Sequence, residues 1–427
     1  MENVFKNRNF RLTFFGALVS NVGALLYSFA VSFYILEITD NNAFLQGLYL
    51  GICGAVSLIF MPIGGILGDR FHKGRIMFVC DYLKGGVILL ATVAMLTLRS
   101  HTAHLVILFA VGILGNAIGG VFSPASSALL PEIVEERQLQ QANSYFSIMS
   151  SLQSIAGVVL AGVLYAALPI HTLFFLVGIC FVASGVSEML IRFDFTPSEG
   201  RLTLRLAFTD MREGLRYLRT RKAILALLGA VLFINFFIAP VTGNFLPYFV
   251  RTDLANAPSY LLDRVLTPEL WSSVFSMSIG LGSLIGAAVL SSRKPAEKCG
   301  YTISVRLCFN AAVMIALSLS YWLLVDRGMS LNAFLLVFCA GGFAAGLLLS
   351  FINIPISTAI MRIVDRDKLS KVNSIISLGA QGMIPIASVL AGVILQSLGS
   401  SPLLAFCSLG FAVTAFLLLI NRTVRDM

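Results

Sequence analysis

The fold is decided by a stretch of sequence that occurs twice. Residues 122–144 read FSPASSALLPEIVEERQLQQANS, and residues 352–374 read INIPISTAIMRIVDRDKLSKVNS. At an offset of 230 residues throughout, the two stretches share Ile-Val, Leu and Asn-Ser, and the match continues to an identical VLAGV at 159–163 and 389–393. Self-similarity at a fixed offset is the signature of a repeated structural unit. The chain therefore uses one unit twice.

The composition places both copies in a membrane. Of the 427 residues, 57% are hydrophobic and 12% are charged, whereas a soluble domain carries roughly 25% charged residues. The apolar runs are continuous over about 20 residues, enough to cross roughly 30 Å of hydrocarbon, while strands of a barrel alternate over about 10 residues. A cytosolic enzyme, a coiled coil, a disordered chain and a β-barrel are all excluded.

The apolar runs predict twelve transmembrane helices, which cover roughly 10–38, 43–68, 76–98, 103–129, 142–168, 172–191, 224–250, 270–291, 302–325, 331–360, 373–398 and 403–420. Six spans separate the two copies of the repeat, so the copies have the same orientation. We expect an all-α membrane protein with two parallel-related six-helix bundles, related by an axis along the membrane normal. The expected boundaries are 1–191 for the first bundle, 192–223 for a linker and 224–427 for the second bundle.

Positive charges predict the orientation. With the N-terminus inside, 26 of the 30 Lys and Arg residues fall on the cytoplasmic side. Loops rich in Lys and Arg stay in the cytoplasm, so both termini are expected there, in a multi-pass protein of the cell membrane. The net charge of +9 then faces anionic lipid headgroups, and no nucleic-acid partner is needed. We expect a monomer.

Two loops have more than one interpretation. In the linker, Phe208, Met211, Leu215 and Leu218 recur at helical spacing, with arginines on another face. This pattern predicts an amphipathic helix on the inner membrane surface, or alternatively a regulatory segment. The outer segment 251–269 is either a short helix over the outer mouth or a passive linker.

The loop between the second and third spans, residues 64–75, reads GGILGDRFHKGR. Its glycines allow close helix packing, and one acid meets several bases at the inner membrane face. Such a cluster can hold the inner ends of two bundles together in one state and release them in another. The candidate residues for this conformational gating are Gly65, Asp69, Arg70, Lys73 and Arg75. The alternative interpretation is a turn that carries ordinary cytoplasmic charge.

This loop resembles the signature loop of the major facilitator superfamily. The stretch from Phe122 to Gly162, including Pro124, Pro131 and Asn143, is similar to the drug and macrolide efflux branch of that family. The resemblance implies a twelve-helix carrier that works by alternating access and exports small molecules in exchange for protons. Two features depart from the antiporter pattern, since the fourth span lacks an arginine and Val158 follows Gly157 where antiporters often have proline.

Proton coupling requires a carboxyl group within the membrane, and three are candidates. Glu37 lies near the outer end of the first span and is either a coupling acid or a solvated helix end; it is the first choice for coupling, because an outward-open cavity would reach it. Asp81 lies in the third span, with Lys84 one turn further on, and either forms an ion pair or binds protons. Glu188 lies near the inner end of the sixth span, where an interfacial position is expected.

A cavity for a mostly apolar ligand requires aromatic walls and a few amides. The candidates from the membrane spans are Asn21, Tyr27, Phe33, Gln153, Asn235, Asn244 and Gln381. Each amide in lipid must find a partner, so the alternative role is interhelical packing. With 33 Phe and 13 Met in the chain, such a cavity can be lined by side chains that repack around a broad range of ligands.

These features favour a secondary active transporter that exports amphipathic or lipophilic small molecules. The alternative is a lipid or lysolipid flippase, or an exporter of metabolites or siderophores, on the same fold. No phosphate-binding loop, zinc-protease motif or serine-hydrolase motif occurs in the sequence. We therefore expect no enzymatic activity, no cofactor and no metal site. The expected partners are a small-molecule substrate, protons and the lipid bilayer.

Overall fold

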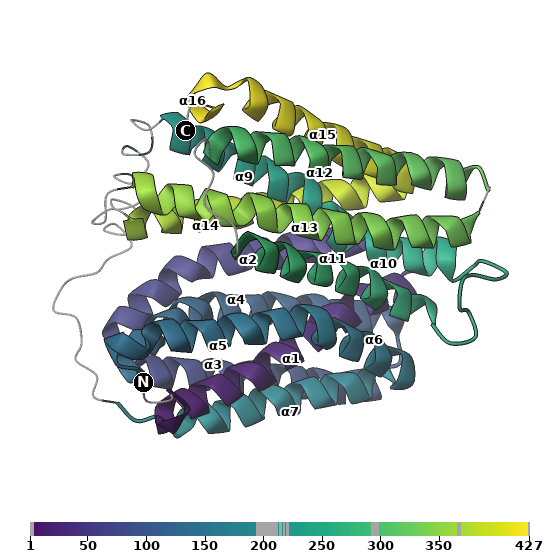
Figure 1. Ribbon diagram of the computed structural model, residues 1–427. Coiled ribbons are helices and arrows are strands. Elements are labelled where there is room, and N and C mark those ends of the chain that lie inside the picture. The colour runs from purple at the N-terminus through teal and green to yellow at the C-terminus, as the bar shows by residue number, and fades with distance from the viewer. Residues whose placement is uncertain are drawn as a thin grey trace. The chain divides into compact units, whose positions relative to one another are not determined.

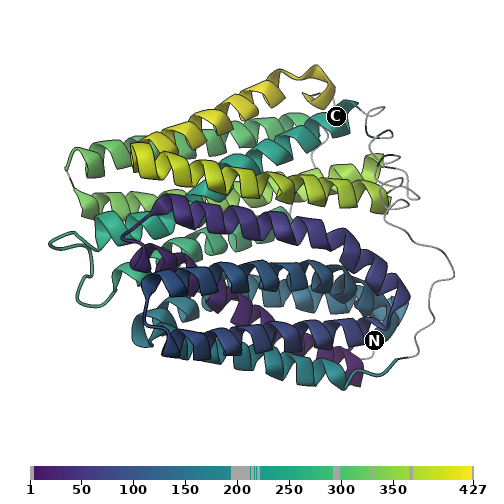
Figure 2. The same ribbon diagram turned by 180° about the vertical axis from the view of Figure 1, so that it is seen from behind.

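The computed structural model describes residues 4–193, 212, 216, 218, 222–291, 299–328, 330–364 and 369–425 (Figures 1 and 2). Every regular element in this part of the chain is helical. The amphipathic helix expected in the linker lies mostly outside the described residues.

Twelve helices or helix groups are long and apolar enough to cross a membrane, which confirms the predicted number. The first six comprise α1 (Arg8–Ile38), α2 (Ala43–Arg70), α3 (Lys73–Thr97), α4 (His101–Ile133), α5 with α6 (Leu139–Leu152 and Val158–Ala167) and α7 (Ile170–Met189). The second six comprise α9 with α10 (Lys222–Pro240 and Leu246–Phe249), α11 (Pro268–Ser291), α12 (Cys299–Tyr321), α13 (Leu331–Ile363), α14 (Leu369–Leu398) and α15 (Ser400–Ile420). A short helix, α16 (Arg422–Arg425), follows.

Three spans contain or end in short π-helical segments, four in all: Gln153–Gly157, Val241–Phe245, Val250–Leu254 and Trp322–Asp326. The segment at Val241 directly follows Pro240, which has no N–H to donate to the preceding turn. Single π-helical turns are rare and often occur at functional sites. Two of the predicted cavity amides, Gln153 and Asn244, lie in such segments.

The outer segment 251–269 contains no separate helix. The π-helical segment ends at Leu254, and turns follow until α11 begins at Pro268. The Tyr260 hydroxyl donates to the carbonyl of Leu266 at 2.9 Å, and the Trp271 indole donates to the carbonyl of Leu261 at 3.2 Å. Side chains thus satisfy the carbonyls of Leu261 and Leu266, and of the two interpretations of this segment the structure agrees with a linker.

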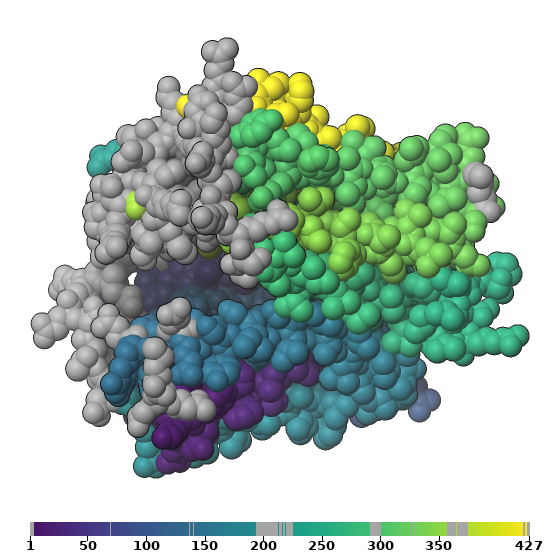
Figure 3. Space-filling model, in the orientation of Figure 1, coloured from purple at the N-terminus to yellow at the C-terminus, as the bar shows by residue number. Residues whose placement is uncertain are grey.

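The chain forms two compact units. Unit 1 comprises Met1–Asp40 and Ile52–Ala207, and unit 2 comprises Asn41–Gly51 and Phe208–Met427. In unit 1, α3 packs against α4 and α7, and α1 packs against α7 (Figures 1 and 2). In the space-filling view, the purple residues of α1 lie beside the blue residues of α5 and α6 (Figure 3).

In unit 2, α11 packs against α13, α12 against α13 and α15, and α9 against α14. The N-terminal part of α2 belongs to this unit, because the backbone N–H of Ala43 donates to the Gln396 side chain at 2.9 Å. Buried rings of Phe245, Phe249 and Tyr321 join those of α13 in an aromatic core. This core fixes the helices of unit 2 at their junction with the π-helical segments.

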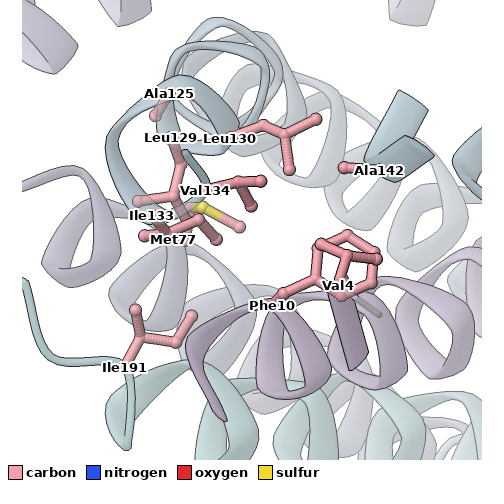
Figure 4. Close-up of a cluster of buried hydrophobic side chains, with 10 residues drawn as sticks. All are labelled: Val4, Phe10, Met77, Ala125, Leu129, Leu130, Ile133, Val134, Ala142 and Ile191. Carbon is pink, nitrogen blue, oxygen red and sulfur yellow. The ribbon is translucent and has the colours of Figure 1, made fainter. Parts of the chain in front are cut away.

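One hydrophobic core of unit 1 lies where the N-terminal segment meets α3, α4 and α5 (Figure 4). Its buried members are Val4, Phe10, Met77, Ala125, Leu129, Leu130, Ile133, Val134, Ala142 and Ile191. The Asn7 side chain caps α1 by accepting from the backbone N–H groups of Asn9 and Phe10, and its amide donates to the carbonyl of Ile133 at 2.6 Å. The N-terminal segment is therefore part of the packed unit.

Candidate functional site

The helices α3 and α7 approach each other at two glycines. A Cβ atom on Gly85 would lie 3.0 Å from the backbone oxygen of Gly178, and a Cβ atom on Gly178 would lie 2.6 Å from the Leu89 side chain. Small residues permit this close approach of helices within a membrane. Because the helices are so close, the side chains one turn further toward the N-terminus of α3 also come together.

Those side chains include two acids. Asp81 on α3 is 3% exposed, and Glu188 on α7 is 1% exposed. The two carboxyl groups interact electrostatically, and Asp81 also faces the fully buried hydroxyl of Ser184. The structure thus unites two of the three predicted coupling acids. It buries Glu188, where the sequence led us to expect an interfacial position.

Lys84 is the cation nearest to this acid pair. Its ammonium lies 4.4 Å from the centre of the Phe181 ring on α7, and a Cβ atom on Gly115 of α4 would lie 3.8 Å from its Cε. Lys84 interacts electrostatically with Asp81. The ion pairs recorded among the described residues are those of Lys73 and Arg137, so the direct ion pair considered for Asp81 and Lys84 is not formed.

A pocket of about 550 Å³ opens beside the acid pair, at the junction of the start of α3 and the end of α7. It is lined by His72, Gly74, Arg75, Phe78, Glu188, Met189, Ile191, Arg192 and Phe193. Glu188 is buried, whereas Arg75 and Arg192 are exposed. The two arginines are therefore accessible to solvent, whereas the carboxyl oxygens of Glu188 are buried beside the pocket.

The predicted gating residues lie around the start of α3. Lys73 is the first residue of that helix, and its ammonium forms an ion pair with Glu132 of α4. Gly65 has open space where a Cβ would be, and Arg70 and Arg75 are exposed. The side chain of Asp69 lies outside what the structure describes. The structure thus joins the loop to α4 through Lys73.

The third predicted coupling acid, Glu37, lies apart from the other two. It is exposed near the end of α1 and accepts a hydrogen bond from the Tyr165 hydroxyl at 3.1 Å. Nearby, the Tyr34 hydroxyl lies 2.6 Å from Nδ1 of His104, whose Nε2 faces the carbonyl of Leu98 at 2.6 Å. Glu37 therefore belongs to a polar end of unit 1 rather than to its buried acid pair.

Four of the predicted cavity residues belong to unit 1. Asn21 is exposed on α1, and Tyr27 on the same helix is half-buried, with its ring centre 5.4 Å from that of Phe174. Phe33 is 1% exposed and packs against Tyr165. Gln153 is half-buried at the start of a π-helical segment. Phe33 thus has a packing role in this structure, and the other three have accessible surface.

The remaining three belong to unit 2. Asn235 is half-buried and donates to the carbonyl of Val231 in its own helix at 2.9 Å. Asn244 is fully buried and donates to the carbonyl of Ser388 on α14 at 3.2 Å. Gln381 is exposed on α14. Asn244 thus joins two helices, which is the packing role considered for these amides.

Two features of the site were not found from the sequence. Ser184 lies four residues before Glu188, so two polar residues on one face of the sixth span were a detectable signal. The pocket beside Glu188 had no such signal, because it depends on how α3 and α7 end. Among the described residues, no group of three or more His, Cys, Asp or Glu side chains is arranged to hold a metal ion.

Comparison with known proteins supports a transporter. The family model described as "Major Facilitator Superfamily" matches residues 12–338. An uncharacterized MFS-type transporter of Bacillus subtilis, YkuC, is 24% identical over 87% of this chain and 82% of its own length. Macrolide efflux protein A of Streptococcus pyogenes is 25% identical over 67% of each chain. Both relatives agree with the resemblance to the superfamily, and the second also agrees with the resemblance to its efflux branch.

The fold has close counterparts among solved structures. The crystal structure of a bacterial homologue of the iron transporter ferroportin, in its inward-facing state, matches with a TM-score of 0.74 and 16% identity over 99% of this chain and 100% of that one. At this identity the likeness shows the fold alone. With the family match over most of the sequence, it confirms the predicted fold class and a transporter rather than an enzyme. The chain belongs to the Major Facilitator Superfamily.

Proposed function

We propose that this protein exports amphipathic or lipophilic small molecules across the cell membrane by alternating access, driven by the proton gradient. The observation that carries the coupling is the buried acid pair of Asp81 and Glu188 within the membrane-spanning part of unit 1. Ionisable groups at membrane depth are costly and commonly mark ion pathways. The efflux of macrolides by a relative of similar length supports the direction of transport and the substrate class.

The substrate contacts that we propose come from residues with accessible surface. Asn21, Tyr27, Gln153, Asn235 and Gln381 are half-buried or exposed in the structure. Amides and one phenol among many apolar side chains give a few directional hydrogen bonds on a mostly apolar wall. Such a wall recognises shape and apolar area more than headgroup charge.

We also propose that the loop of Gly65, Asp69, Arg70, Lys73 and Arg75 controls the switch between states. The ion pair of Lys73 with Glu132 supports this role because it ties the start of α3 to α4. A network that forms in one state and breaks in the other biases a two-state equilibrium by the difference in its free energy. An Asp69→Asn variant should slow turnover and leave substrate affinity in one state nearly unchanged.

The proposed setting is a monomer in the cell membrane with both termini in the cytoplasm. The distribution of Lys and Arg, with 26 of 30 on one side of the expected spans, supports this orientation. Two six-helix bundles with boundaries at 1–191 and 224–427 would pivot around the cavity. Glycosylation or thiol labelling at each terminus in intact cells tests the orientation independently of transport.

The experiment that tests the proposed function uses purified protein in proteoliposomes. A radiolabelled macrolide is loaded, and its movement is followed with and without a proton gradient of defined direction. We expect transport against the macrolide gradient only when the proton gradient is present, and its loss on addition of a protonophore. Transport that continues at an unchanged rate after the gradient is collapsed would overturn the proposed coupling. Absence of movement for every amphipathic compound would overturn the substrate class.

A further inference from the structure

The pocket at the junction of α3 and α7 lies where two membrane spans end. The span of α3 begins at Lys73 and the span of α7 ends at Met189, and the residues that line the pocket come from 72–78 and 188–193. Its volume of about 550 Å³ is within the roughly 300–1,000 Å³ of small-molecule sites. A cavity at the end of two spans lies at the level where lipid headgroups meet the acyl chains.

The walls of this pocket are fixed by packing. The rings of His72 and Phe193 lie against each other, with their centres 4.2 Å apart. A Cβ atom on Gly74 would lie 3.2 Å from Cε1 of His72, so glycine leaves room for the imidazole against the start of α3. Ile191 is a buried member of the hydrophobic core in Figure 4, and Phe193 packs against that core. Because the protein itself orders these walls, a ligand loses little free energy to ordering them.

The accessible charge of the pocket is positive. Arg75 and Arg192 are exposed, and His72 is half-buried. Glu188 also lines the pocket, but both of its carboxyl oxygens are buried, so this acid presents no charge at the opening. The N–H groups in the first turn of α3 add a partial positive charge at the same place. Together these groups favour an anion, and guanidinium groups bind phosphate oxygens through charge-assisted hydrogen bonds.

Arg192 is held at the pocket through its backbone. Its N–H donates to Oδ1 of Asn9 at 3.1 Å, and the Asn9 side-chain amide donates to the carbonyl of Arg192 at 2.5 Å. Asn9 belongs to α1, which packs against α7. These two hydrogen bonds fix the point from which the Arg192 guanidinium extends, whereas Arg75 extends from the first turn of α3. The two guanidinium groups therefore come from two separately anchored segments.

An apolar stripe on α7 leads from the pocket along the span. Met189 lines the pocket, and Ile179, Val186 and Met189 are all exposed. Their spacing of seven and three residues places them on one face of the helix. An exposed apolar face on a membrane span is covered by acyl chains. The pocket thus offers cationic groups to a headgroup, and the stripe offers apolar surface to a chain of the same molecule.

We propose that this pocket binds the phosphate headgroup of one anionic phospholipid, with an acyl chain along Val186 and Met189. The net positive charge around the opening selects an anionic headgroup over a zwitterionic one. A free phosphate compound shares the headgroup chemistry but has no chain to cover the apolar stripe. The inference concerns lipid binding by unit 1 and does not rest on the proposed function, because lipid binding is measured on the purified protein without transport.

The experiment is a lipid titration of the full chain, purified in a non-ionic detergent and followed by native mass spectrometry. The probe is dioleoylphosphatidylglycerol, and dioleoylphosphatidylcholine is the zwitterionic lipid with the same chains. We expect one phosphatidylglycerol to be retained per chain at concentrations at which phosphatidylcholine is not retained. Arg192→Gln and Arg75→Gln should each weaken this binding about tenfold, because a charge-assisted hydrogen bond is lost. Met189→Ala should weaken it by about threefold through lost apolar contact.

Arg8→Gln is the matched control. Arg8 is an exposed arginine next to Asn9, at the same end of unit 1, and it does not line the pocket. Its replacement should change the binding by less than about twofold, because an exposed charge outside the pocket is screened. Melting curves establish that each variant is folded, and Arg75→Gln decides the outcome if Arg192→Gln does not fold.

Two results would overturn the proposal. If the pocket variants weaken the binding no more than Arg8→Gln does, the lipid is attracted only by the general positive charge of this end of unit 1. If glycerol 3-phosphate raises the melting temperature as much as phosphatidylglycerol does at the same concentration, and Met189→Ala binds the lipid as the parent protein does, the pocket is a site for free phosphate compounds and not for a lipid.

Discussion

Replacing Glu132 with Gln should destabilise unit 1 by about 2–3 kcal/mol. Breaking a fully buried ion pair costs about 3–5 kcal/mol because one charge is left without a partner. The Lys73 side chain is 8% exposed, but that of Glu132 is 33% exposed, so solvent screening reduces the cost to roughly half or two thirds. Lys73 is also the first residue of α3, where the helix dipole disfavours a cation that has lost its ion pair with Glu132 by about 0.3–1 kcal/mol.

The neighbouring pair of Glu135 and Arg137 is a matched control. Its side chains are 60% and 75% exposed, with 2.5 Å between the Glu135 Oε2 and the Arg137 Nε. Exposed pairs contribute at most about 1 kcal/mol and often nothing measurable. Glu135→Gln is the same chemical change three residues further along the chain, and it should cost about 0.5 kcal/mol or less.

The assay is denaturant-induced unfolding of purified protein in detergent micelles, followed by circular dichroism. A double-mutant cycle with Lys73→Met isolates the coupling energy between Lys73 and Glu132, which should be at least about 1.5 kcal/mol. The double variant should regain part of the stability lost by Glu132→Gln, because the ammonium that lost its carboxylate partner is removed as well. If Glu132→Gln costs no more than Glu135→Gln, the assignment of a stabilising, partly buried ion pair at the start of α3 is refuted.

Three further predictions follow from the same packing. Asn7→Ala removes the cap of α1 and should cost about 1–2 kcal/mol of stability, measured by the same unfolding assay. Gly85→Ala should weaken the contact of α3 with α7 and reduce thermal stability. Gly86→Ala, where a Cβ atom would have no neighbour within 4 Å, should instead raise stability by up to about 1 kcal/mol. Equal effects of the two variants would argue against the close approach of α3 and α7 at Gly85. Glu188→Gln and Asp81→Asn should each abolish gradient-driven efflux and leave substrate binding measurable by thermal shift. If efflux by both variants still depends on the proton gradient, the acid pair does not couple proton movement to transport.

The helices and the twofold repeat could be predicted because they depend on local signals. Each span is a continuous apolar run, and the structure begins and ends its helices within a few residues of the predicted limits. The identical VLAGV segments lie on α6 and α14, which occupy equivalent places in the two sets of six spans. Signals of this kind need no knowledge of how one helix is rotated against another.

The acid pair could not be predicted because it depends on helix register. Asp81 and Glu188 are more than one hundred residues apart, and their meeting is set by the contact of Gly85 with Gly178. Nothing in the sequence of either span fixes which of its faces meets the other. The same reason explains why Glu188 was placed at the interface, since its position near a helix end suggests exposure until the packing of α1 against α7 is known.

The cavity residues show a different limit. A sequence reveals which spans contain amides, but it does not reveal whether an amide bonds its own helix, as Asn235 does, or a neighbouring helix, as Asn244 does. The conformation of the segment 251–269 could not be predicted for a related reason. The side chains of Tyr260 and Trp271 donate to the carbonyls of Leu266 and Leu261, and no periodic pattern in the sequence encodes these contacts.

The central claim is that the acid pair links proton movement to export, and simultaneous flux measurement tests it most directly. Proteoliposomes that contain a pH-sensitive dye report proton movement while labelled macrolide is counted in the same sample. We predict that macrolide movement is accompanied by proton movement in the opposite direction in the parent protein, and that Glu188→Gln abolishes this exchange. Macrolide transport without any accompanying movement of protons would contradict the account.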